Sequence, residues 1–451
     1  MRVAWFSPWP PERSGIAVCS ADLVPALCRE GWGVDVFVDA GNVPVPPSGS
    51  APPMPGVYRL QSAHDFVWRV ARHKYDVTVY QLGNSTVHDF IWPYVFRWPG
   101  VAVLHETRLH HARAHALLSR RQVAEYRAEF AWNQPSVPPD AAELGVMGLA
   151  GTYYYLWPMV RRIVESSRLT ATHTPGAAAE LRAAYPSHAI DQIALGHGRV
   201  APVDAAACAA LRARLGIRKS EVLIGVFGGL SAEKRVPQIL RAFAHSARRR
   251  PDVRLLLAGA PDGAVDIVAM VHALGIADRV TLAPSLDDED FDLAVAAADI
   301  CVNLRWPTAV EVSGPWLRAL AAGRPTITLE LVHQTHVPAL DPRTWQPLNP
   351  ESGDAPVTVA VDLLDEEHSL RLALDRLTND TDLCAMLGRA GRAYWEREHS
   401  PARMVTDYVR VVTKAALMPD PTPSPGLPDT DPLSLTRALL SPFGEVPCEL
   451  R

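Results

Sequence analysis

The chain has 451 residues, with 44 basic and 49 acidic side chains and a formal net charge of −5. This balance excludes the strongly basic surface typical of nucleic-acid-binding proteins, and 48% hydrophobic with 21% charged residues excludes a disordered or fibrous chain. The length exceeds what one hydrophobic core usually serves, so we expect two domains.

Cysteine usage and the N-terminal sequence bear on location and metal binding. The six cysteines are scattered, with no CxxC motif and no histidine pair at metal-ligand spacing, which predicts reduced thiols and no metal site. The N-terminus lacks a long apolar stretch, and no window approaches the roughly 18 uninterrupted apolar residues of a membrane span. We therefore expect a cytoplasmic protein.

The chain begins with a strand, loop, helix and strand, the repeating unit of a parallel sheet. Val3–Phe6 is an apolar run, a helical pattern covers Ile16–Arg29, and GWGVDVFVD supplies the next strand. Ser14 and Gly15 lie where the loop joins the helix, and the missing Cβ of Gly15 would let a ligand approach the backbone. A plain turn explains this one dipeptide equally well.

Further strands are predicted at 75–81, 101–105 and 169–173, each followed by polar residues. In open parallel sheets the ligand crevice lies beyond the carboxyl ends of the strands. The candidates for lining it are Gly83, Asn84, His105, Glu106 and His173. A histidine ending a strand is ordinarily just hydrogen-bonded locally, but the polar segment after His105 favours substrate contact, and its histidine spacing matches no structural zinc site.

An arginine-rich run follows from Leu109 to Glu129, and it includes Arg113 and Arg127. The ordinary interpretation is a solvated helix face. The alternatives are a site for a phosphate-bearing acceptor or contact with an anionic membrane, because an aromatic segment with two arginines follows at Thr152–Val164. For that aromatic segment, core packing of a helix is the favoured interpretation.

A second α/β series begins after a connector rich in alanine and charge. We expect domains at residues 1–198 and 221–393, a linker at 199–220, a C-terminal helix at 394–417 that has a break near His399 and returns to the first domain, and a disordered tail at 418–451. Strands are predicted at 222–227, 253–259, 280–283, 300–304 and 325–329, with helices at 236–249, 264–274 and 291–298. Such regular alternation predicts a doubly wound parallel sheet.

Two loops of this second half carry candidate binding residues. In GGLSAEKR, Gly228 and Gly229 allow a tight strand-to-helix turn, and Lys234 with Arg235 places two cations where a diphosphate could be neutralised. The spacing is not that of a nucleotide-hydrolysing P-loop, and exposed cations are common.

The second loop leads into a helix within CVNLRWPTAVEVSGPWLRALAAGR. Ser313 or Gly314 can cap this helix, whose free N–H groups and dipole favour phosphate, and Glu311 precedes the cap where it could hold a sugar or ribose hydroxyl. An ordinary capped helix beside a solvated glutamate remains the alternative.

Several blocks in the right order resemble GT-B glycosyltransferases, and within them the retaining glycosyltransferase family 4, or glycosyl transferases group 1. The blocks are RPDVRLLLAGAPDG, LGIADRVTLAPSLDDEDFDLAVAAADICVNLRWPTAVEVSG and LRALAAGRPTITLE, and the resemblance covers roughly Met1–Ala416. It implies an α/β fold with two Rossmann-like domains, each built on a parallel sheet, that face each other across a cleft.

The resemblance assigns roles residue by residue. Ser14 and Gly15 match the loop that approaches the donor phosphate and sugar, and His105 matches the histidine that contacts the transferred sugar. Lys234, with Arg235 beside it, matches the basic site on the diphosphate. Glu311 matches the first acid of the family's E-x7-E motif, and Ser313 and Gly314 offer N–H groups to phosphate.

The sequence departs from the family pattern at two positions. Gly229 stands where many relatives place a phosphate-binding arginine. Counting eight residues from Glu311 reaches Ala319, and the alignment on ALAAG puts Arg318 at the second acidic position, so the usual ribose-binding glutamate is missing. This leaves the recognition of the nucleotide open.

The resemblance implies a metal-independent hexosyltransferase that moves a sugar, with retention, from a nucleoside-diphosphate-sugar to an acceptor hydroxyl. It implies no further cofactor, and the expected acceptor is a glycan, a lipid-linked or a small molecule, with peripheral contact to an anionic inner membrane face as an option. The alternatives are a GT-B sugar epimerase or phosphorylase, and a catalytically silent nucleotide-sugar-binding partner, which the missing acid suggests.

Overall fold

The computed structural model describes residues 1–12, 14–44, 54–198, 204–283, 286 and 288–422. The chain divides into two compact units. Unit 1 comprises Met1–Ile193, Ala309–Glu311 and the chain from Val405, and unit 2 comprises Ala194–Thr308 and Val312–Met404. The division after Ile193 falls just before the boundary that the sequence predicts, and most of the tail predicted as disordered lies outside the described residues.

Unit 1 contains a seven-stranded parallel sheet in the order β3-β2-β1-β4-β5-β6-β7. Its strands are β1 (Arg2–Phe6), β2 (Gly33–Val38), β3 (Tyr58–Ser62), β4 (Val77–Leu82), β5 (Val101–Leu104), β6 (Leu169–Thr172) and β7 (Ile190–Gln192). All residues of β2 and β4 are buried, as expected for central strands that helices cover on both faces. The edge strands β3 and β7 are more polar, and the sequence analysis missed them.

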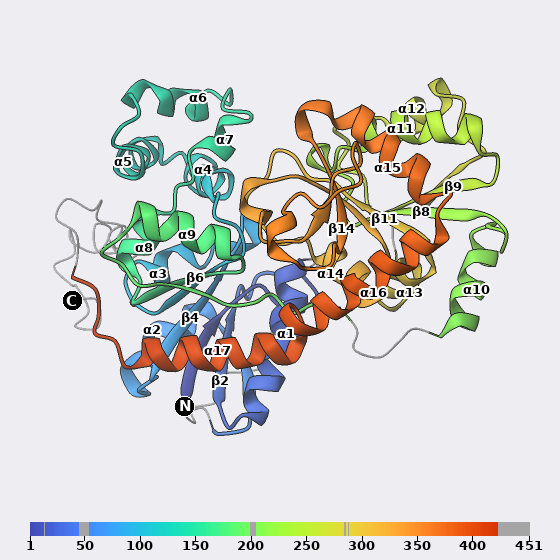
Figure 1. Ribbon diagram of the computed structural model, residues 1–451. Helices are drawn as coiled ribbons and strands as arrows, with labels where there is room; N and C mark the ends of the chain where they lie inside the picture. The colour runs from blue at the N-terminus through green and yellow to red at the C-terminus, as the bar shows by residue number, and fades with distance from the viewer. Residues whose placement is uncertain (13, 45–53, 199–203, 284–285, 287, 423–451) are drawn as a thin grey trace. The chain divides into compact units, whose positions relative to one another are not determined.

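Helices and short 3-10 turns connect these strands. The helices are α1 (Gly15–Arg29), α2 (Phe66–Arg72), α3 (Trp92–Val95), α4 (His110–Leu118), α5 (Val123–Asn133), α6 (Ala142–Val146), α7 (Tyr153–Leu156), α8 (Arg161–Ser166), α9 (Pro175–Ala184) and the part of α17 (Pro401–Ala416) from Val405. Figure 1 shows α4 to α7 gathered into a group of their own beyond the strands. This group arises because the chain makes five short helices between β5 and β6.

The arginine-rich run is only partly the solvated face that its sequence predicts. Arg113 on α4 is buried and binds Glu129 on α5 through two hydrogen bonds of 2.6 and 2.7 Å, and Arg162 on α8 binds the same carboxylate at 2.8 Å. Arg127, two residues before Glu129, instead forms an exposed ion pair with Glu143. Through Glu129, Arg113 and Arg162 therefore link the helices α4, α5 and α8. The predicted solvated face is wrong for Arg113 because its buried partner, Glu129, lies 16 residues further along the chain.

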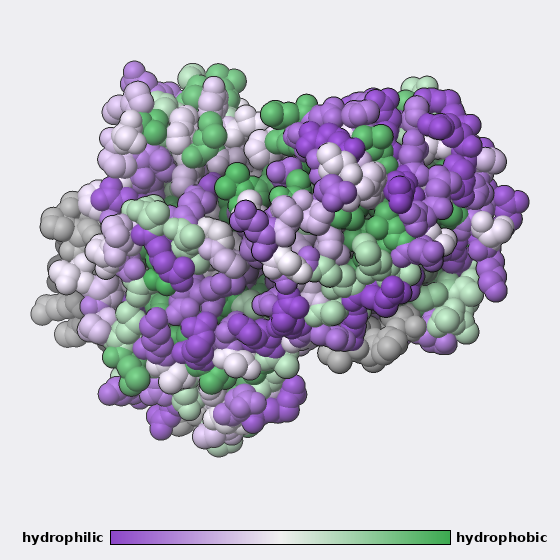
Figure 2. Space-filling view, viewed as in Figure 1, coloured by the Kyte–Doolittle hydropathy of each residue, from purple (hydrophilic) through white to green (hydrophobic). Residues whose placement is uncertain are grey.

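The aromatic segment at 152–164 is not one continuous helix. It forms α7 and α8, and between them Trp157 and Met159 leave helical geometry, with φ of +54° at Met159. Ile163 packs in the core as predicted, whereas Leu156 is exposed. Figure 2 shows hydrophobic side chains at the surface over α6 and α7, where Met147 and Leu149 are also exposed.

Unit 2 contains a second seven-stranded parallel sheet in the order β10-β9-β8-β11-β12-β14-β13. Its strands are β8 (Val222–Phe227), β9 (Val253–Ala258), β10 (Val280–Ala283), β11 (Ile300–Asn303), β12 (Thr326–Leu329), β13 (Ala339–Leu340) and β14 (Thr358–Val361). Two doubly wound parallel sheets confirm the predicted fold class within each unit. The sequence analysis did not identify β13 and β14.

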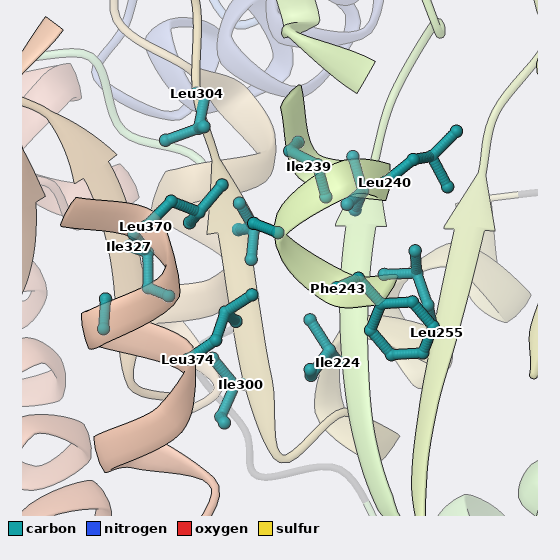
Figure 3. Close-up of a cluster of buried hydrophobic side chains, with 14 of the residues drawn as sticks. Ile224, Ile239, Leu240, Phe243, Leu255, Ile300, Leu304, Ile327, Leu370 and Leu374 are labelled. Atoms are coloured by element: carbon teal, nitrogen blue, oxygen red, sulfur yellow. The ribbon is translucent and has the colours of Figure 1, made fainter. Parts of the chain in front are cut away.

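The helices of unit 2 pack their apolar faces on this sheet. They are α10 (Ala205–Arg214), α11 (Val236–Arg249), α12 (Ile267–Ala273), α13 (Asp288–Ala297), α14 (Gly314–Ala321), α15 (Glu366–Leu377), α16 (Thr381–Glu398) and the beginning of α17. In Figure 3, Phe243 of α11 lies against Leu255 of β9, while Leu370 and Leu374 of α15 lie near Ile327 of β12.

The predicted linker at 199–220 contains the helix α10, which is part of unit 2. Leu211 is buried in a cluster with Ala294 and Ala298, so α10 covers α13 rather than merely connecting the domains. The alanine-rich sequence hides this helix because so few of its positions are large and apolar. The predicted break near His399 is found, since α16 ends at Glu398 and α17 begins at Pro401.

Two further observations concern the whole described chain. Within it, no helix combines the length and the apolar character needed to cross a membrane. Five cysteines fall in the described residues, and all five are free thiols.

Candidate functional site

The strand orders point to one position in each sheet where a ligand can approach the backbone. In unit 1 the order reverses between β1 and β4, and in unit 2 between β8 and β11. At such a switch point the connections leave to opposite faces of the sheet, which opens a crevice at the carboxyl ends of the strands. The loops that begin at Ser7, Gly83, Gly228 and Leu304 are therefore the ones to inspect.

In unit 1 the residues after β4 and β5 contact each other. The carboxylate of Glu106 accepts a hydrogen bond from the backbone N–H of Asn84, and the Asn84 side chain accepts one from the backbone N–H of Ala112 at 2.9 Å. A Cβ on Gly83 would lie 2.5 Å from Ile16 and 2.8 Å from His88. Glu106 and Asn84 thus fix the loop, and any Cβ at position 83 would require the side chains of Ile16 and His88 to shift.

His105 and His173 also meet, which the sequence could only suggest. Nδ1 of His105 lies 3.1 Å from Nε2 of His173, and Nε2 of His105 lies 2.7 Å from the side-chain oxygen of Gln81. Burial, reinforced by the nearby His173 and His88, holds the pKa of His105 well below its ordinary value. His105 is therefore a neutral ring at neutral pH, with both nitrogens engaged.

Ser14 and Gly15 begin α1, directly beyond β1. The side chain of Ser14 caps the helix by accepting a hydrogen bond from the N–H of Ile16 at 3.2 Å. A Cβ on Gly15 would meet nothing within 4 Å, so the space beside this backbone is open. An open approach to a helix N-terminus suits an anion, as the sequence predicts for this pair.

In unit 2 the loop after β8, Lys234 and the start of α14 come together. A Cβ on Gly228 would lie 3.1 Å from Nζ of Lys234 and 3.2 Å from Pro315, and the backbone at Gly228 has φ of +88°, which favours glycine. Lys234 is buried, and its ammonium donates to the carbonyl of Phe227 at 2.6 Å. Lys234 and the N-terminus of α14 thereby share one end of the sheet.

Ser313 caps α14, as one of the two predicted options. Its side chain accepts a hydrogen bond from the N–H of Trp316 at 3.3 Å, and Pro315 occupies the first turn. Gly314 is the first residue of the helix. Glu311 is nearly buried and belongs to the short segment Ala309–Glu311 that clusters with unit 1.

Arg235 is directed away from Lys234. It pairs with the carboxylate of Glu366 at the start of α15, with one hydrogen bond of 2.8 Å from Nε, and its backbone is left-handed with φ of +58°. A non-glycine residue in this conformation carries strain, which the ion pair helps to hold. A Cβ on Gly229 would have its nearest neighbour, the carbonyl oxygen of Ala260, at 4.0 Å, so there is room for a side chain at this position.

Arg318, at the position of the missing acid, has a set of partners of its own. Its Nε donates to Nε2 of His197 at 2.8 Å, its Nη1 lies 3.1 Å from the carboxylate of Asp292, and its guanidinium lies over the ring of Phe291. A negative charge is therefore present beside position 318, but it comes from α13 rather than α14.

Sequence reasoning missed several polar residues that shape these sites. Gln81 and Glu366 were not singled out because an internal strand position and a helix start are both ordinary places for their residue types. Asn303 ends β11 at the switch point, and the described residues give neither atom of its buried amide a partner. Among the described residues, no group of three or more His, Cys, Asp or Glu side chains is placed to hold a metal ion.

Residues 209–331 match the model of the family "Glycosyl transferases group 1". Over 97 residues the chain is 37% identical to a D-inositol 3-phosphate glycosyltransferase of Mycobacterium sp. (strain KMS), which is 20% of this chain and 21% of the relative. The chain also resembles sucrose-phosphate synthase from Thermosynechococcus elongatus, with a TM-score of 0.61 at 17% identity over 92% of this chain and 98% of that one. Residues 209–331 thus resemble the group 1 glycosyltransferases, and the fold resembles that of these GT-B structures.

A third comparison supports the same fold. Anabaena HepE in complex with UDP-glucose matches with a TM-score of 0.60 at 15% identity, over 92% of this chain and 100% of that one. The recognised resemblance is confirmed at the level of the fold, and in sequence for the GT-B region that contains the loop after β8, Lys234 and α14. The match to the mycobacterial relative spans only about a fifth of that protein's length.

Proposed function

We propose that this protein transfers a sugar from a nucleoside-diphosphate-sugar donor to an acceptor hydroxyl, with retention of configuration at the anomeric carbon. The observation that carries the proposal is the convergence of Lys234, the Gly228 turn and the N-terminus of α14 at the switch point of unit 2. This convergence lies inside the region that matches the group 1 family. HepE in complex with UDP-glucose, a protein of the same fold, favours a nucleotide-sugar as the donor.

Transfer from such a donor needs charge that stabilises the departing diphosphate. The buried ammonium of Lys234 and the N-terminus of α14 are fixed before a ligand arrives, so little reorganisation is required during the reaction. Arg235 contributes through its ion pair with Glu366, which holds the loop that carries Lys234. The diphosphate oxygen can itself take the acceptor proton, so no protein nucleophile is required.

The ring of His105, with both nitrogens engaged within the protein, suits positioning better than proton transfer, because burial holds its pKa well below the ordinary value. Gly15 would admit a phosphate or sugar to the backbone of unit 1, and Glu311 would hold sugar hydroxyls. We propose that these residues orient the donor, that Ser313 and Gly314 bind its phosphate, and that neither a metal ion nor a further cofactor takes part.

The acceptor is proposed as a glycan, a lipid-linked or a small molecule. The name of the mycobacterial relative favours a phosphorylated polyol among the small molecules. We propose that the protein works in the cytoplasm, and that the exposed Met147, Leu149 and Leu156 mark where peripheral membrane contact would be sought.

A catalytically silent nucleotide-sugar-binding protein is the second candidate. It is favoured by Arg318, which stands where the resemblance expects an acid and is paired with Asp292. Donor binding without transfer to any acceptor of a broad panel would support it. A requirement for inorganic phosphate would instead indicate a phosphorylase.

The experiment begins with thermal-shift screening of UDP-, GDP- and ADP-sugars, followed by transfer assays with the donor that binds. Replacing Lys234 by Ala should lower transfer about a hundredfold or more, because one preorganised contact to the developing charge is lost. Lys219→Ala is the matched control, since Lys219 is an exposed lysine of the same unit. Equal loss in both variants, or unchanged turnover in Lys234→Ala, would remove Lys234 from the mechanism.

A further inference from the structure

A chain of hydrogen bonds runs beneath the carboxyl edge of the unit 1 sheet. It begins at the hydroxyl of Tyr408 on α17, 3.2 Å from the side-chain oxygen of Gln81, and continues from Gln81 to Nε2 of His105 at 2.7 Å. Nδ1 of His105 lies 3.1 Å from Nε2 of His173, and Nδ1 of His173 lies 2.9 Å from the backbone carbonyl of Ile193. All four side chains are buried, so each proton in the chain must be matched to an acceptor.

The carbonyl of Ile193 fixes the direction of the chain, because a carbonyl can only accept. Nδ1 of His173 must therefore carry a proton. In a neutral ring Nε2 of His173 is then an acceptor, so Nδ1 of His105 carries the proton between the two rings, and Nε2 of His105 is left with a lone pair.

This lone pair needs a donor, and Gln81 is the residue that faces it. With the amide oxygen toward His105, two acceptors would lie 2.7 Å apart, while the amide nitrogen of Gln81 would be buried without a partner. A half-turn of the amide, whose oxygen and nitrogen have the same shape, removes the contact between two acceptors and gives the amide nitrogen its partners, while the amide oxygen takes the buried position without one. One N–H then donates to Nε2 of His105 and the other to the hydroxyl oxygen of Tyr408.

We propose that Gln81 is a positioning residue that donates to Nε2 of His105 and so holds His105 in the neutral form with its proton on Nδ1. Both ring nitrogens are then occupied by protein partners, and the ring orientation is tied to β4, β6 and α17 at once. The effect of Gln81 on transfer rests on the proposed function, whereas the protonation of His105 does not.

The consequence for the site is that His105 is not an exchangeable acid or base. The ring of His105 instead supports the carboxyl ends of the strands. Tyr408 connects α17 to this support, and its ring centroid lies 5.5 Å from that of Trp5. A change at Gln81 should therefore alter turnover through the placement of His105, without removing a group that touches substrate.

The direct test is nitrogen-15 NMR of the histidine side chains in the full-length protein. His105 is assigned as the signal that disappears in His105→Gln. We expect a ring protonated on Nδ1 alone, unchanged between about pH 5 and 8. A ring protonated on Nε2 alone, or on both nitrogens within that range, would overturn the proposal.

Gln81→Glu reverses the polarity, because a carboxylate only accepts. His105 should then carry a proton on Nε2, and the adjacent charge should bring its titration into the measurable range. The kcat for transfer should fall on the order of tenfold to a hundredfold with a smaller change in the KM for donor. Gln61→Glu is the matched control, a buried glutamine on β3 of the same sheet, and it should leave the His105 signals unchanged.

If Gln81→Glu does not fold, Tyr408→Phe replaces it. This variant removes one acceptor of the Gln81 amide and should keep the proton of His105 on Nδ1; a shift to Nε2 would show that Gln81 does not control the ring.

The two proposals fail separately. Wild-type protein that transfers sugar with His105 protonated on Nε2 refutes the role of Gln81, whereas the expected NMR signals without any transfer refute the proposed function.

Discussion

The carboxyl edges of the two sheets have the same topology but are built from different chemistry. In unit 1 the polar side chains of the edge bind one another and the backbone, with His105, His173 and Gln81 in one chain and the Glu106 carboxylate bound to the backbone of Asn84. In unit 2 the edge combines a buried ammonium with the N-terminus of α14.

The two edges differ in what they can offer a ligand: a fixed surface in unit 1 and a positive charge in unit 2. In unit 1 the polar groups hold one another in place. The open space at this edge lies beside the backbone of Gly15. Unit 2 fixes its loop with the Arg235–Glu366 pair and keeps a positive potential at the switch point. For the proposed donor, the unit 1 edge suits a sugar and the unit 2 edge suits a diphosphate, so changes to each edge should have distinct signatures.

The largest expected effect comes from Glu129, which supports the helices beyond the unit 1 edge. Glu129→Ala leaves Arg113 and Arg162 buried without their counterion and should lower the free energy of unfolding by about 4 kcal/mol. Burial alone would raise the pKa of Glu129, but the two arginines outweigh it and hold that pKa below the ordinary value. Denaturant melts measure the loss.

Glu143→Ala is the control for this prediction, because Glu143 makes a similar two-bond pair with Arg127 at the surface. Solvent screens that pair, so its loss should have little effect. Equal destabilisation by both variants would show that burial of the Arg113–Glu129–Arg162 cluster is not what matters. Hydrogen exchange should show the loss of protection in α4, α5 and α8 and not in the strands of unit 2.

The next effect is a loss of stability in acid that arises from the unit 1 edge. Burial lowers the pKa of His88 to about 4, whereas the unfolded chain titrates near 6.5, so between these values the unfolded state binds more protons. Stability is complete above about pH 6.5 and should fall by about 3 kcal/mol for this residue as the pH drops to about 4.

His88→Asn isolates this contribution, since the Asn amide can replace the hydrogen bond from Nδ1 of His88 to the carbonyl of Gln81. The slope of unfolding free energy against pH should decrease by about one proton in the variant. His110 and His399, whose pKa values burial lowers to about 3 and about 4, retain their own share of the slope. An unchanged slope would mean that His88 is protonated in the folded protein.

A smaller effect is expected at the unit 2 edge from a single methyl group. A Cβ on Gly259 would lie 2.2 Å from the carbonyl oxygen of Gly228, so Gly259→Ala should displace the turn beside Lys234 and cost about 2 kcal/mol. Gly229→Ala, in the same turn, meets only the Ala260 carbonyl at 4.0 Å and should be tolerated. Thermal melts and donor binding should separate the two variants, and equal donor binding would place the Gly228 turn outside the donor site.

The local features of the fold were predictable because short stretches of sequence determine them. The bounds of β8 and α11 agree with the prediction, and Ser313 caps α14 because a serine before a proline favours a helix start. The strands β3 and β7 were missed because polar edge strands lack an apolar run.

The site was less predictable, because its partners come from distant parts of the chain. Tyr408 and Gln81 are 327 residues apart, and Arg235 and Glu366 are 131 apart. A sequence pattern shows that Arg235 is a cation near a phosphate loop, but it does not show which carboxylate holds it. The loops that carry candidates could therefore be located, whereas the direction of their side chains required the folded units.

The smallest expected effect on stability separates a ligand role for Gly15 from a structural one. Gly15→Ala adds a methyl group where nothing lies within 4 Å, at the first position of α1, so stability should stay the same or rise by up to about 1 kcal/mol. The same methyl group would occupy the space through which a donor approaches the backbone, and donor affinity should fall. Gly41→Ala, at an exposed loop position of unit 1, is the control for general effects of the substitution. If Gly15→Ala binds donor as tightly as the wild type, the open backbone beside Gly15 is not where the donor lies.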